Sequence, residues 1–525
     1  MFRRHRFSVV RTFVFIVCIV FIVSSLLQST GPDGIIRQTS LTGRFYPSAV
    51  NFPALRSKAF LLQEQSSEQG QQQTLSSAEY DHKQFLRALL ATCTNTHRSP
   101  AAAKVLANVA GLNGVASRAI FRTTHNNALD HQTPPRFNPN ILPYPRGAVH
   151  PYLGFAQQAP TSIGQNELPM GRHSIFYCDM DWVMSDLADH RRELVCQDAA
   201  MKLDIPPPVA TTAGACTQRP ELENTRGFVE PRVIRSPSGE PLLIVGSSSV
   251  DNCISQYIVD LRTLIPDLAS KMKINELSTP IRFRALTMLP RPTNFSESEH
   301  DYTLLFDSVN HIFVEQSLEP RSITALSTLD TDADQEKVFA IDNPESSFKC
   351  FASLLKRSSD PANRRTFVQQ ATNTLRVTLC EWPCEPTIEN TVLISIMHVK
   401  YQNFDSVHYQ RHLVAMSPTA PFEILARSSP LHYAGIDERD MVYTSQIAWD
   451  HMHFRSHSTA STVVAPSRGD YATAKRSVQQ TNSLVSDHHH GWLDDTIMIS
   501  ISINNQETAV LHSSIADLLG CLQLC

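Results

Sequence analysis

A carboxylate and a guanidinium lie two positions apart in residues 227–232, directly before a short apolar run that begins at Val233. The proline between Glu230 and Arg232 restricts the backbone, so both side chains are predicted to stand at the start of a strand. A carboxylate there can accept a proton from a hydroxyl group, and the arginine can hold an anionic group. Glu230 is therefore a candidate catalytic residue and Arg232 a candidate substrate-binding residue; the alternative is an ordinary surface ion pair.

A second group of polar side chains fills residues 488–495, where three histidines precede a glycine, a tryptophan and two aspartates. Neighbouring residues of an extended chain point to opposite faces, so at most two of the histidines can converge, and no metal site is expected. The pattern favours Asp494 or Asp495 as a catalytic carboxylate at the rim of a cavity, with His490 beside it and Trp492 as a stacking surface for a sugar ring. The alternative is a turn whose aspartates cap backbone N–H groups.

The elements that must position these groups are predicted to be short strands. In residues 497–503, isoleucines at every second position alternate with Met498, Ser500 and Ser502, the two-residue period of a half-buried strand. Similar runs occupy 242–247, 303–307, 312–315, 392–399, 412–416 and 442–449. So many short strands over nearly 400 residues exceed one sandwich and predict an all-β fold, most economically a β-propeller. Two stretches, 330–347 and 455–486, are predicted to be surface loops.

The N-terminus predicts one membrane span. Four arginines between Arg3 and Arg11 precede an uncharged stretch at 12–32. About 20 uncharged residues can cross a bilayer as a helix, and cationic residues on the leading side stay cytosolic. We therefore expect a cytoplasmic tail at 1–11, a signal anchor at 12–32 and a lumenal C-terminal part, with a cleaved secretory signal as the alternative.

Residues 33–135 are predicted to form a stem. Its first part is rich in glutamine and serine and has little that could build a core. Between 78 and 112, apolar residues recur at helical intervals, first from Phe85 to Leu90 and again from Val105 to Val109, with Pro100 between the two runs. We predict two short helices there.

The cysteines indicate an oxidising compartment. Ten of the 11 cysteines follow the predicted span, and neither Cys380 with Cys384 nor Cys521 with Cys525 has the spacing of a zinc or redox pair. Disulfides are therefore expected, with their connectivity open. In the same compartment, Asn294 of the sequence Asn-Phe-Ser could carry an N-glycan.

Composition excludes some classes of function. The 525 residues are 42% hydrophobic, enough for one large or two ordinary domains. With 46 basic and 50 acidic residues, the formal net charge is −4, so the overall positive charge typical of nucleic-acid-binding proteins is missing. No nucleic-acid partner is expected.

Several segments resemble fungal type II membrane proteins of the Golgi with a five-bladed β-propeller like those of glycoside hydrolase families 43 and 130. Residues 138–143 and 150–155 resemble their opening blade, and 230–232, 390–393 and 490–495 resemble later ones. The resemblance covers most of 136–525. It implies a five-bladed lumenal propeller and glycan chemistry, as in mannoside phosphorylases and fungal β-1,2-mannosyltransferases, with Asn138 as a substrate contact.

The resulting hypothesis is a glycosyltransferase of the β-mannosyltransferase kind acting on cell-wall or glycoprotein glycans. Glu230 is the general base or acid, Arg232 orients the substrate, and Asp494 or Asp495 assists from another blade. The leaving phosphate of a nucleotide-sugar donor is held by cations, and the candidates are Arg232, Arg282, Arg284 and Arg321. No metal or other cofactor is expected. The alternatives are a glycoside hydrolase or phosphorylase, and an inactive carbohydrate-binding or scaffold propeller.

Overall fold

The computed structural model describes parts of the chain between residues 86 and 525. The described residues are 86–87, 104–106, 117–123, 136–145, 147–158, 172–184, 192–208, 226–249, 254–274, 279–290, 301–326, 344–356, 365–402, 407–437, 439–450, 490–520 and 522–525. All of them belong to one unit of the chain, Gly70–Cys525. The predicted membrane span at 12–32 and the sequon at Asn294 lie outside them. None of the helices in this described part is long and apolar enough to cross a membrane.

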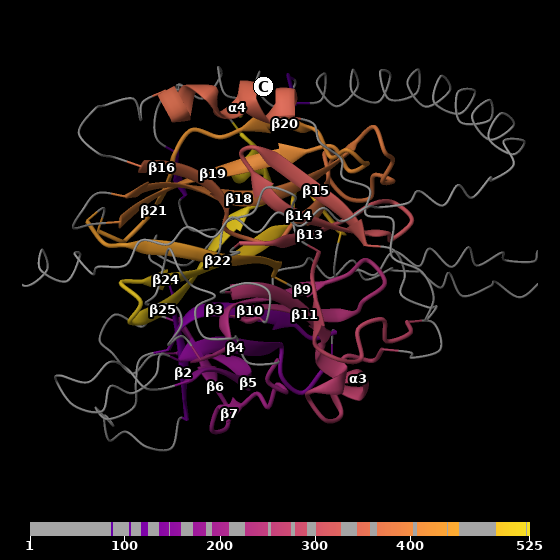
Figure 1. Cartoon of the computed structure of the whole chain (residues 1–525), viewed down its shortest axis with the longest axis vertical. Coiled ribbons are helices and arrows are strands. Elements are labelled where there is room, and N and C mark those ends of the chain that lie inside the picture. Colours follow the sequence, from indigo (N-terminus) through magenta and orange to yellow (C-terminus); the bar gives the residue numbers. More distant parts are fainter. Residues whose placement is uncertain are drawn as a thin grey trace, which may run out of the picture. The chain divides into compact units, whose positions relative to one another are not determined.

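The described chain is mostly β-structure, and its strands form four hydrogen-bonded sheets (Figure 1). Two of the sheets are small. One contains β9 (Val229–Arg235), β10 (Pro241–Ser248), β11 (Ile254–Asp260) and β12 (Thr287–Met288). The other contains β13 (Thr303–Phe306), β14 (Ile312–Leu318) and β15 (Arg321–Leu326).

The two other sheets are larger because antiparallel runs are joined through edge strands. The ten-stranded sheet contains β22 (Val442–Trp449), β24 (Thr496–Ile503), β25 (Glu507–Ser514), β2 (Ser117–Thr123), β6 (Arg192–Cys196), β5 (Arg172–Met184), β4 (Tyr152–Gln158) and β3 (Arg136–Pro143), with β7 (Met201–Lys202) and β8 (Arg226–Gly227) beside β5. The nine-stranded sheet contains β1 (Lys104–Leu106), β21 (Leu431–Tyr433), β19 (Val407–Met416), β18 (Thr391–Gln402), β17 (Leu375–Thr378), β23 (His490–Trp492), β16 (Arg365–Gln370), β20 (Ile424–Arg427) and β26 (Gln523–Leu524).

Helices are few and short in the described residues. They are the 3-10 helix η2 (Leu261–Thr263), α3 (Leu268–Lys271), α4 (Pro344–Lys356) and α5 (Ile515–Leu519). In α4, the buried side chains of Cys350, Phe351 and Leu354 recur at helical spacing and pack into an apolar cluster with β18 and β19. The helix starts with a proline, which is compatible with the first turn because its missing N–H would have no partner there.

The strand predictions are confirmed, because two-residue alternation reports directly on a half-buried pleated surface. The predicted strands at 242–247, 312–315, 392–399, 412–416, 442–449 and 497–503 fall within β10, β14, β18, β19, β22 and β24, and the one at 303–307 ends a residue early in β13.

Two local predictions are wrong. The second predicted stem helix contains instead β1, which pairs in parallel with β21 in the register Val105 with His432. A short isolated helix is marginal in water, and pairing with a formed strand satisfies the same backbone groups. The loop predicted at 330–347 also runs into α4 at Pro344. Since β2 pairs with β6 and β25, the sheets begin before residue 136. The second loop, 455–486, lies outside the described residues.

Five strand segments contact one another in a closed series: β3, β9, the start of β13, residues 370–378 and β22. We call them the central strands. Hydrogen bonds join each segment of the series to the next: Val233 N to Asn140 Oδ1 (3.0 Å), Arg232 Nη2 to Asp301 Oδ1 (2.6 Å), Thr374 Oγ1 to Leu304 O (3.3 Å), Ile447 N to Asn373 Oδ1 (3.0 Å) and Ser445 Oγ to Pro139 O (2.5 Å). Side chains thus satisfy backbone groups that inner sheet edges would otherwise leave unpaired.

Disulfides are present, as the cysteine content predicted. Cys178–Cys196 joins β5 to β6, Cys350–Cys525 joins α4 to the C-terminal residue, and Cys380–Cys384 closes a short loop after β17. The expected oxidation is therefore confirmed for these six cysteines, and Cys93, Cys216, Cys253 and Cys521 lie outside the described residues.

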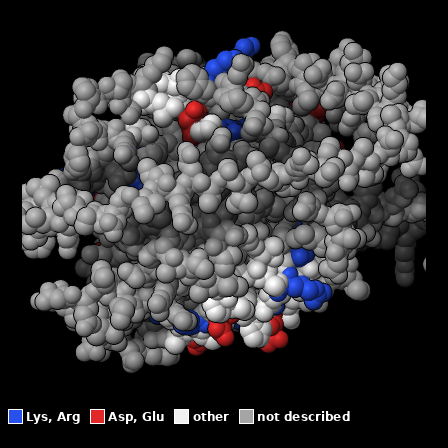
Figure 2. Space-filling model, viewed as in Figure 1, with Lys and Arg blue, Asp and Glu red and all other residues white. Residues whose placement is uncertain are grey.

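Charged residues are mixed on the surface. In the view of Figure 2, the described Lys and Arg lie in small groups with Asp and Glu nearby. This arrangement agrees with the near-balance of basic and acidic residues in the sequence.

Candidate active site

Five polar residues gather near the beginnings of four central strands. Asn138 lies in β3, Glu230 and Arg232 in β9, Asp301 two residues before β13, and Tyr443 at the second position of β22. We call these five residues the central cluster. They come from parts of the sequence more than 300 residues apart, and the closed series of strands brings them together.

Three members of the central cluster have a left-handed backbone. The φ angles of Asn138 and Glu230 are both 52°, and that of Asp301 is 65°. Asparagine and aspartate tolerate this region, whereas for glutamate it costs more, of order 1–3 kcal/mol. Asn138 and Glu230 also lie where the pairing register of β3 and β9 shifts. Such irregularities re-aim side chains and are common beside functional sites.

Gln157 of β4 fixes the strained segment of Glu230. Its Oε1 atom accepts a hydrogen bond from the backbone N–H of Glu230 at 2.8 Å and another from Asn138 Nδ2 at 3.3 Å. Its Nε2 atom lies 3.1 Å from His173 Nδ1. Burial lowers the pKa of His173, and the nearby Glu230 opposes that shift. One buried amide therefore connects three strands around the half-buried glutamate.

Arg232 is a buried cation whose hydrogen-bonding capacity is only partly used. Its exposed fraction is 4%. The Nη2 atom donates to Asp301 Oδ1 at 2.6 Å, to the backbone oxygen of Gln370 at 3.0 Å and to the hydroxyl of Tyr443 at 3.3 Å. The Nη1 atom is buried and has no hydrogen-bond partner in the structure. Burial alone would lower the pKa of Arg232, but Tyr443, Asp301 and Glu230 together raise it.

Asp301 accepts hydrogen bonds from two sides. Besides the arginine, the hydroxyl of Tyr443 donates to Asp301 Oδ1 at 2.9 Å. Burial, and then the charge of Asp301, raise the pKa of Tyr443 well above its usual value. Tyr409 packs edge to face on Tyr443 at 5.5 Å between ring centroids, and burial followed by Asp301 and Glu230 raises its pKa too. Both tyrosines therefore remain protonated donors at neutral pH.

Further buried polar atoms near the cluster have no partner. The side-chain Oε1 and Nε2 atoms of Gln370 and the Nδ1 atom of His398 are buried without a hydrogen bond. His398 accepts from the backbone N–H of Thr444 through Nε2 at 3.3 Å and contacts the ring of Tyr443. Its pKa is lowered, first by burial and then by nearby Arg411 and Arg232. Unpartnered buried donors and acceptors are uncommon in proteins, and four such atoms lie in or beside the central cluster.

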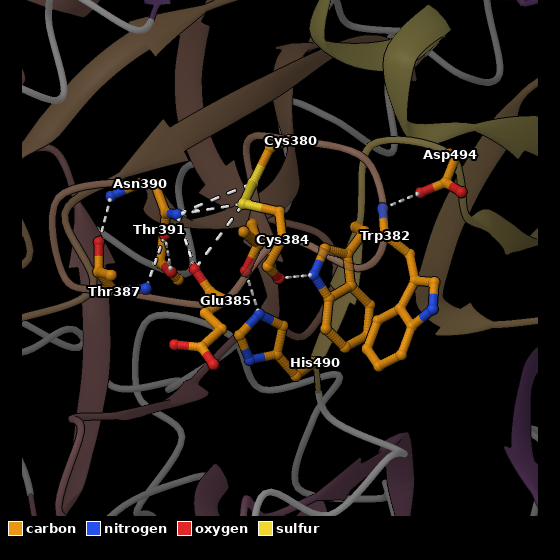
Figure 3. The surroundings of a disulfide bond; sticks show 11 residues. Cys380, Trp382, Cys384, Glu385, Thr387, Asn390, Thr391, His490 and Asp494 are labelled. Carbon is orange, nitrogen blue, oxygen red and sulfur yellow. Dashed lines mark hydrogen bonds between the residues drawn. A yellow bond between two sulfur atoms is a disulfide. The ribbon is translucent and has the colours of Figure 1, made fainter. Parts of the chain in front are cut away.

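The histidine, tryptophan and aspartates of residues 490–495, the second group that the sequence predicted, do not belong to the central cluster. Residues 490–495 pack on the loop closed by Cys380–Cys384 (Figure 3). The indole N–H of Trp492 donates to the backbone oxygen of Cys384 at 2.8 Å, and Asp494 accepts from the backbone N–H of Trp382 at 3.2 Å. We call this group, formed by the 380–384 loop with His490, Trp492, Asp494 and Asp495, the disulfide-loop cluster.

Asp495 has the role of a turn cap. Its Oδ2 atom accepts from the backbone N–H of Trp492 at 2.7 Å. This is the alternative that the sequence left open for the two aspartates. His490 is buried, contacts Thr378 Oγ1 and stacks on Trp492 at 5.2 Å between ring centroids. Burial, with a smaller effect of Arg376, lowers its pKa to about 4.

The structure does not bring the two groups together. Tyr443 of the central cluster lies at the beginning of β22, while Trp449 at its end pairs with Ile497, next to Asp495. Six residues of strand span about 20 Å. Asp494 and Asp495 therefore lie at the C-terminal ends of the central strands, whereas Glu230 lies at their N-terminal ends.

The three other predicted arginines are not in the central cluster. Arg321 is buried. Its guanidinium donates hydrogen bonds to Glu315 Oε1 at 2.7 Å, to the backbone oxygen of Phe422 at 2.6 Å and to the sulfur of Met416. Arg282 makes an ion pair with Glu240, with its Nε 2.7 Å from Oε1. Arg284 is exposed. Arg321 therefore links β15 to Phe422 and to Met416 of β19, and Arg282 is engaged by Glu240 next to β10.

Sequence reasoning missed Asp301, Tyr443, Tyr409, His398 and Gln157. A usable signal existed for two of them, because Asp301 directly precedes one predicted strand and Tyr443 opens another. The other three lie in strand interiors, where a polar residue is usually a solvent-facing position of the alternation. Among the described residues, no group of three or more His, Cys, Asp or Glu side chains is arranged to hold a metal ion.

No protein-family model and no curated protein matches the chain. Among solved structures, a mannose phosphorylase from Leishmania mexicana is similar with 9% identity, a TM-score of 0.34 and coverage of 84% of this chain and 95% of its own. A GDP-Man-dependent mannosyltransferase from the same organism has 10% identity, a TM-score of 0.34 and coverage of 76% and 89%. The catalytic domain of a GH62 α-L-arabinofuranosidase from Coprinopsis cinerea has 11% identity, a TM-score of 0.31 and coverage of 76% and 97%. At this level of similarity, the activity has to be inferred from the chain's own residues.

Proposed function

We propose that the chain is a glycan-active enzyme, a glycosyltransferase of the β-mannosyltransferase kind, on a five-bladed β-propeller. The closed series of five central strands supports the architecture, with each strand opening one antiparallel run as the inner strand of a blade. The central cluster is then the active site at the mouth of the propeller. The motif resemblance around Glu230, Pro231 and Arg232 supports the chemistry.

The observation that carries the proposal is the convergence of two carboxylates and a buried cation in the central cluster. Asp301 is held by Arg232 and Tyr443, while Glu230 is half-buried on a backbone fixed by Gln157. A transferase needs one carboxylate to accept the proton of the attacking hydroxyl and a cation to stabilise the leaving phosphate. Glu230 supplies the first, and Arg232, with its unpartnered Nη1 atom, supplies the second.

In the proposed reaction, the acceptor hydroxyl gives its proton to the Glu230 carboxylate as its oxygen forms a bond to the anomeric carbon. The bond between that carbon and the donor phosphate breaks, and its electron pair stays on the phosphate, which Arg232 holds. Asp301 and Tyr443 keep the guanidinium in place. An in-line attack of this kind inverts the anomeric centre.

The test is a donor and acceptor screen on the full chain, with nucleotide-activated sugars and manno-oligosaccharides and mass detection of products. We expect an acceptor extended by one sugar, and a rate lowered at least about a hundredfold in Glu230→Gln, the usual range for loss of a general base. Asp495→Asn, at the other end of the strands, is the matched control and should retain activity. Release of free sugar without transfer would instead favour a hydrolase with Asp301 as the second carboxylate. Glycan binding without any product would favour an inactive carbohydrate-binding propeller.

The proposed location is the lumen of the Golgi or another secretory compartment, with a type II anchor at 12–32. The three disulfides support an oxidising compartment. Lumenal exposure can be tested by expressing Asn294→Gln in cells that N-glycosylate proteins. Loss of a glycan would lower the mass of the full chain. No shift would leave Asn294 without a glycan and contradict that part of the proposal.

A further inference from the structure

A tryptophan is exposed on the loop that the Cys380–Cys384 disulfide closes. Trp382 has an exposed fraction of 43% and Ile388, six residues later, one of 42%. Most large aromatic side chains in the described residues are buried, and leaving an indole in water forgoes the stabilisation of its burial. An exposed indole offers a flat apolar surface on which a ligand can stack.

The loop holds Trp382 in a fixed position. The disulfide closes one side, and Asn390 fastens the other through its Nδ2 bond to the oxygen of Glu385 at 3.0 Å and its Oδ1 bond from the N–H of Thr387 at 2.7 Å (Figure 3). The backbone N–H of Trp382 itself donates to Asp494. A surface ordered before binding loses little conformational entropy when a ligand arrives.

The exposed indole is part of an aromatic group. Trp382 packs edge to face on Trp492 at 4.8 Å between ring centroids, with an interplanar angle of 86°. Trp492 is in turn stacked on His490 and anchored through its indole N–H to Cys384. The support beneath Trp382 is therefore rigid, and the side chain remains 43% exposed after these contacts.

The chemistry around the indole selects a class of ligand. Exposed Glu381, Glu385 and Glu389 lie in the same loop, and residues 380–390 contain no lysine or arginine. Carboxylates accept hydrogen bonds from hydroxyl groups and repel phosphate, sulfate or uronate groups. An exposed indole in a segment rich in hydrogen-bond acceptors and free of basic side chains matches an uncharged sugar, which offers a C–H face for stacking and hydroxyl donors at its edge.

We propose that Trp382, supported by Trp492 in an exposed segment that carries three glutamates and no basic residue, forms an accessory binding site for an uncharged glycan. The site lies at the C-terminal ends of the central strands, whereas Glu230 lies at their N-terminal ends. It can therefore hold a long acceptor chain without occupying the reaction centre. The proposal extends the proposed function but does not depend on catalysis by Glu230.

The test is calorimetric titration of the full chain with a neutral manno-oligosaccharide. Glu230→Gln in the background prevents turnover. Trp382→Ala should remove one binding event, with affinity at that site falling at least about tenfold. The matched control is Phe367→Ala, because Phe367 is an aromatic residue with a similar exposed fraction of 45% on β16. Trp382→Leu, which keeps an apolar side chain without a flat ring, gives the same readout if the alanine variant does not fold.

Unchanged titration curves for both Trp382 variants would overturn the proposal, as would an equal loss in Phe367→Ala. Binding of hexalysine that depends on Trp382, without binding of the oligosaccharide, would also overturn it and assign the surface to a cationic peptide. Absence of transfer by the unchanged chain, with oligosaccharide binding at Trp382 intact, would contradict the proposed function alone. The two failures are thus distinguishable.

Discussion

The central cluster and the disulfide-loop cluster hold similar residue types but use them differently. In the disulfide-loop cluster, the aspartates accept backbone N–H groups and the indole N–H of Trp492 is taken by Cys384. In the central cluster, Arg232 Nη1 and the side-chain amide of Gln370 are buried without partners. Buried hydrogen-bonding capacity that the protein leaves unused is costly, and the proposed function assigns that of the central cluster to substrate binding.

The same contrast separates two buried arginines. Arg321 uses Nε, Nη1 and Nη2 on three different groups of its surroundings. Arg232 makes its three bonds through Nη2 alone. The two arginines are thus both buried but differ in the number of nitrogen atoms that the protein engages.

Replacing Arg321 should lower the stability of the fold and leave the activity per folded molecule unchanged. Arg321→Met leaves Glu315 buried and unpaired, and breaking a buried ion pair in this way costs about 3–5 kcal/mol. Urea unfolding would measure the change. Activity per folded molecule should stay near that of the unchanged protein, because Arg321 is not in the central cluster. A loss of specific activity with unchanged stability would give Arg321 a direct role in substrate binding.

Acid should destabilise the protein through buried histidines, of which His412 is the clearest. Burial lowers its pKa to about 4. The unfolded chain, with an ordinary histidine pKa, therefore binds a proton between about pH 6.5 and 4 that the folded protein does not, and stability falls as the pH falls through this range. Between pH 7 and 5 the loss from one such group is about 2 kcal/mol.

His412→Gln checks this pH dependence. The variant should show a shallower fall in thermal stability between pH 7 and 5, whatever its stability at pH 7. An identical slope in both proteins would show that His412 does not titrate as described. His490, with its pKa also lowered to about 4, should contribute a second share of the same sign.

Adding a methyl group at Gly491 should disturb the disulfide-loop cluster and leave the central cluster alone. A Cβ atom there would lie 2.4 Å from the ring of the buried Trp449, so the ring or the strand must shift. Overpacking of this kind costs about 1–3 kcal/mol. Thermal unfolding of Gly491→Ala measures it, and an unchanged melting temperature would mean that the ring moves at no cost.

The smallest expected effect comes from Asp495. Asp495→Asn weakens the cap on the N–H of Trp492 and should cost about 1 kcal/mol, the usual loss for a weakened local cap. Denaturant unfolding at neutral pH is sufficient to measure it. A loss of catalysis larger than this stability change would restore Asp495 as a catalytic candidate.

The sequence predicted the strands well because alternation along a strand depends only on neighbouring residues. It also singled out Glu230 and Arg232, whose spacing is local, and the structure places both in the central cluster. It could not identify Asp301 as the partner of Arg232, since that ion pair exists only where the series of central strands closes. For the same reason, the string at 490–495 suggested a site next to Glu230, although the register of β22 with β24 places it at the other end.

The most direct test of the central claim is the transfer rate of Glu230→Gln compared with Asp495→Asn in the full chain, both corrected for folded fraction. The account predicts a loss of at least about a hundredfold for the first and a change within about twofold for the second. Equal retention of transfer in both variants, or a loss confined to Asp495→Asn, would contradict it.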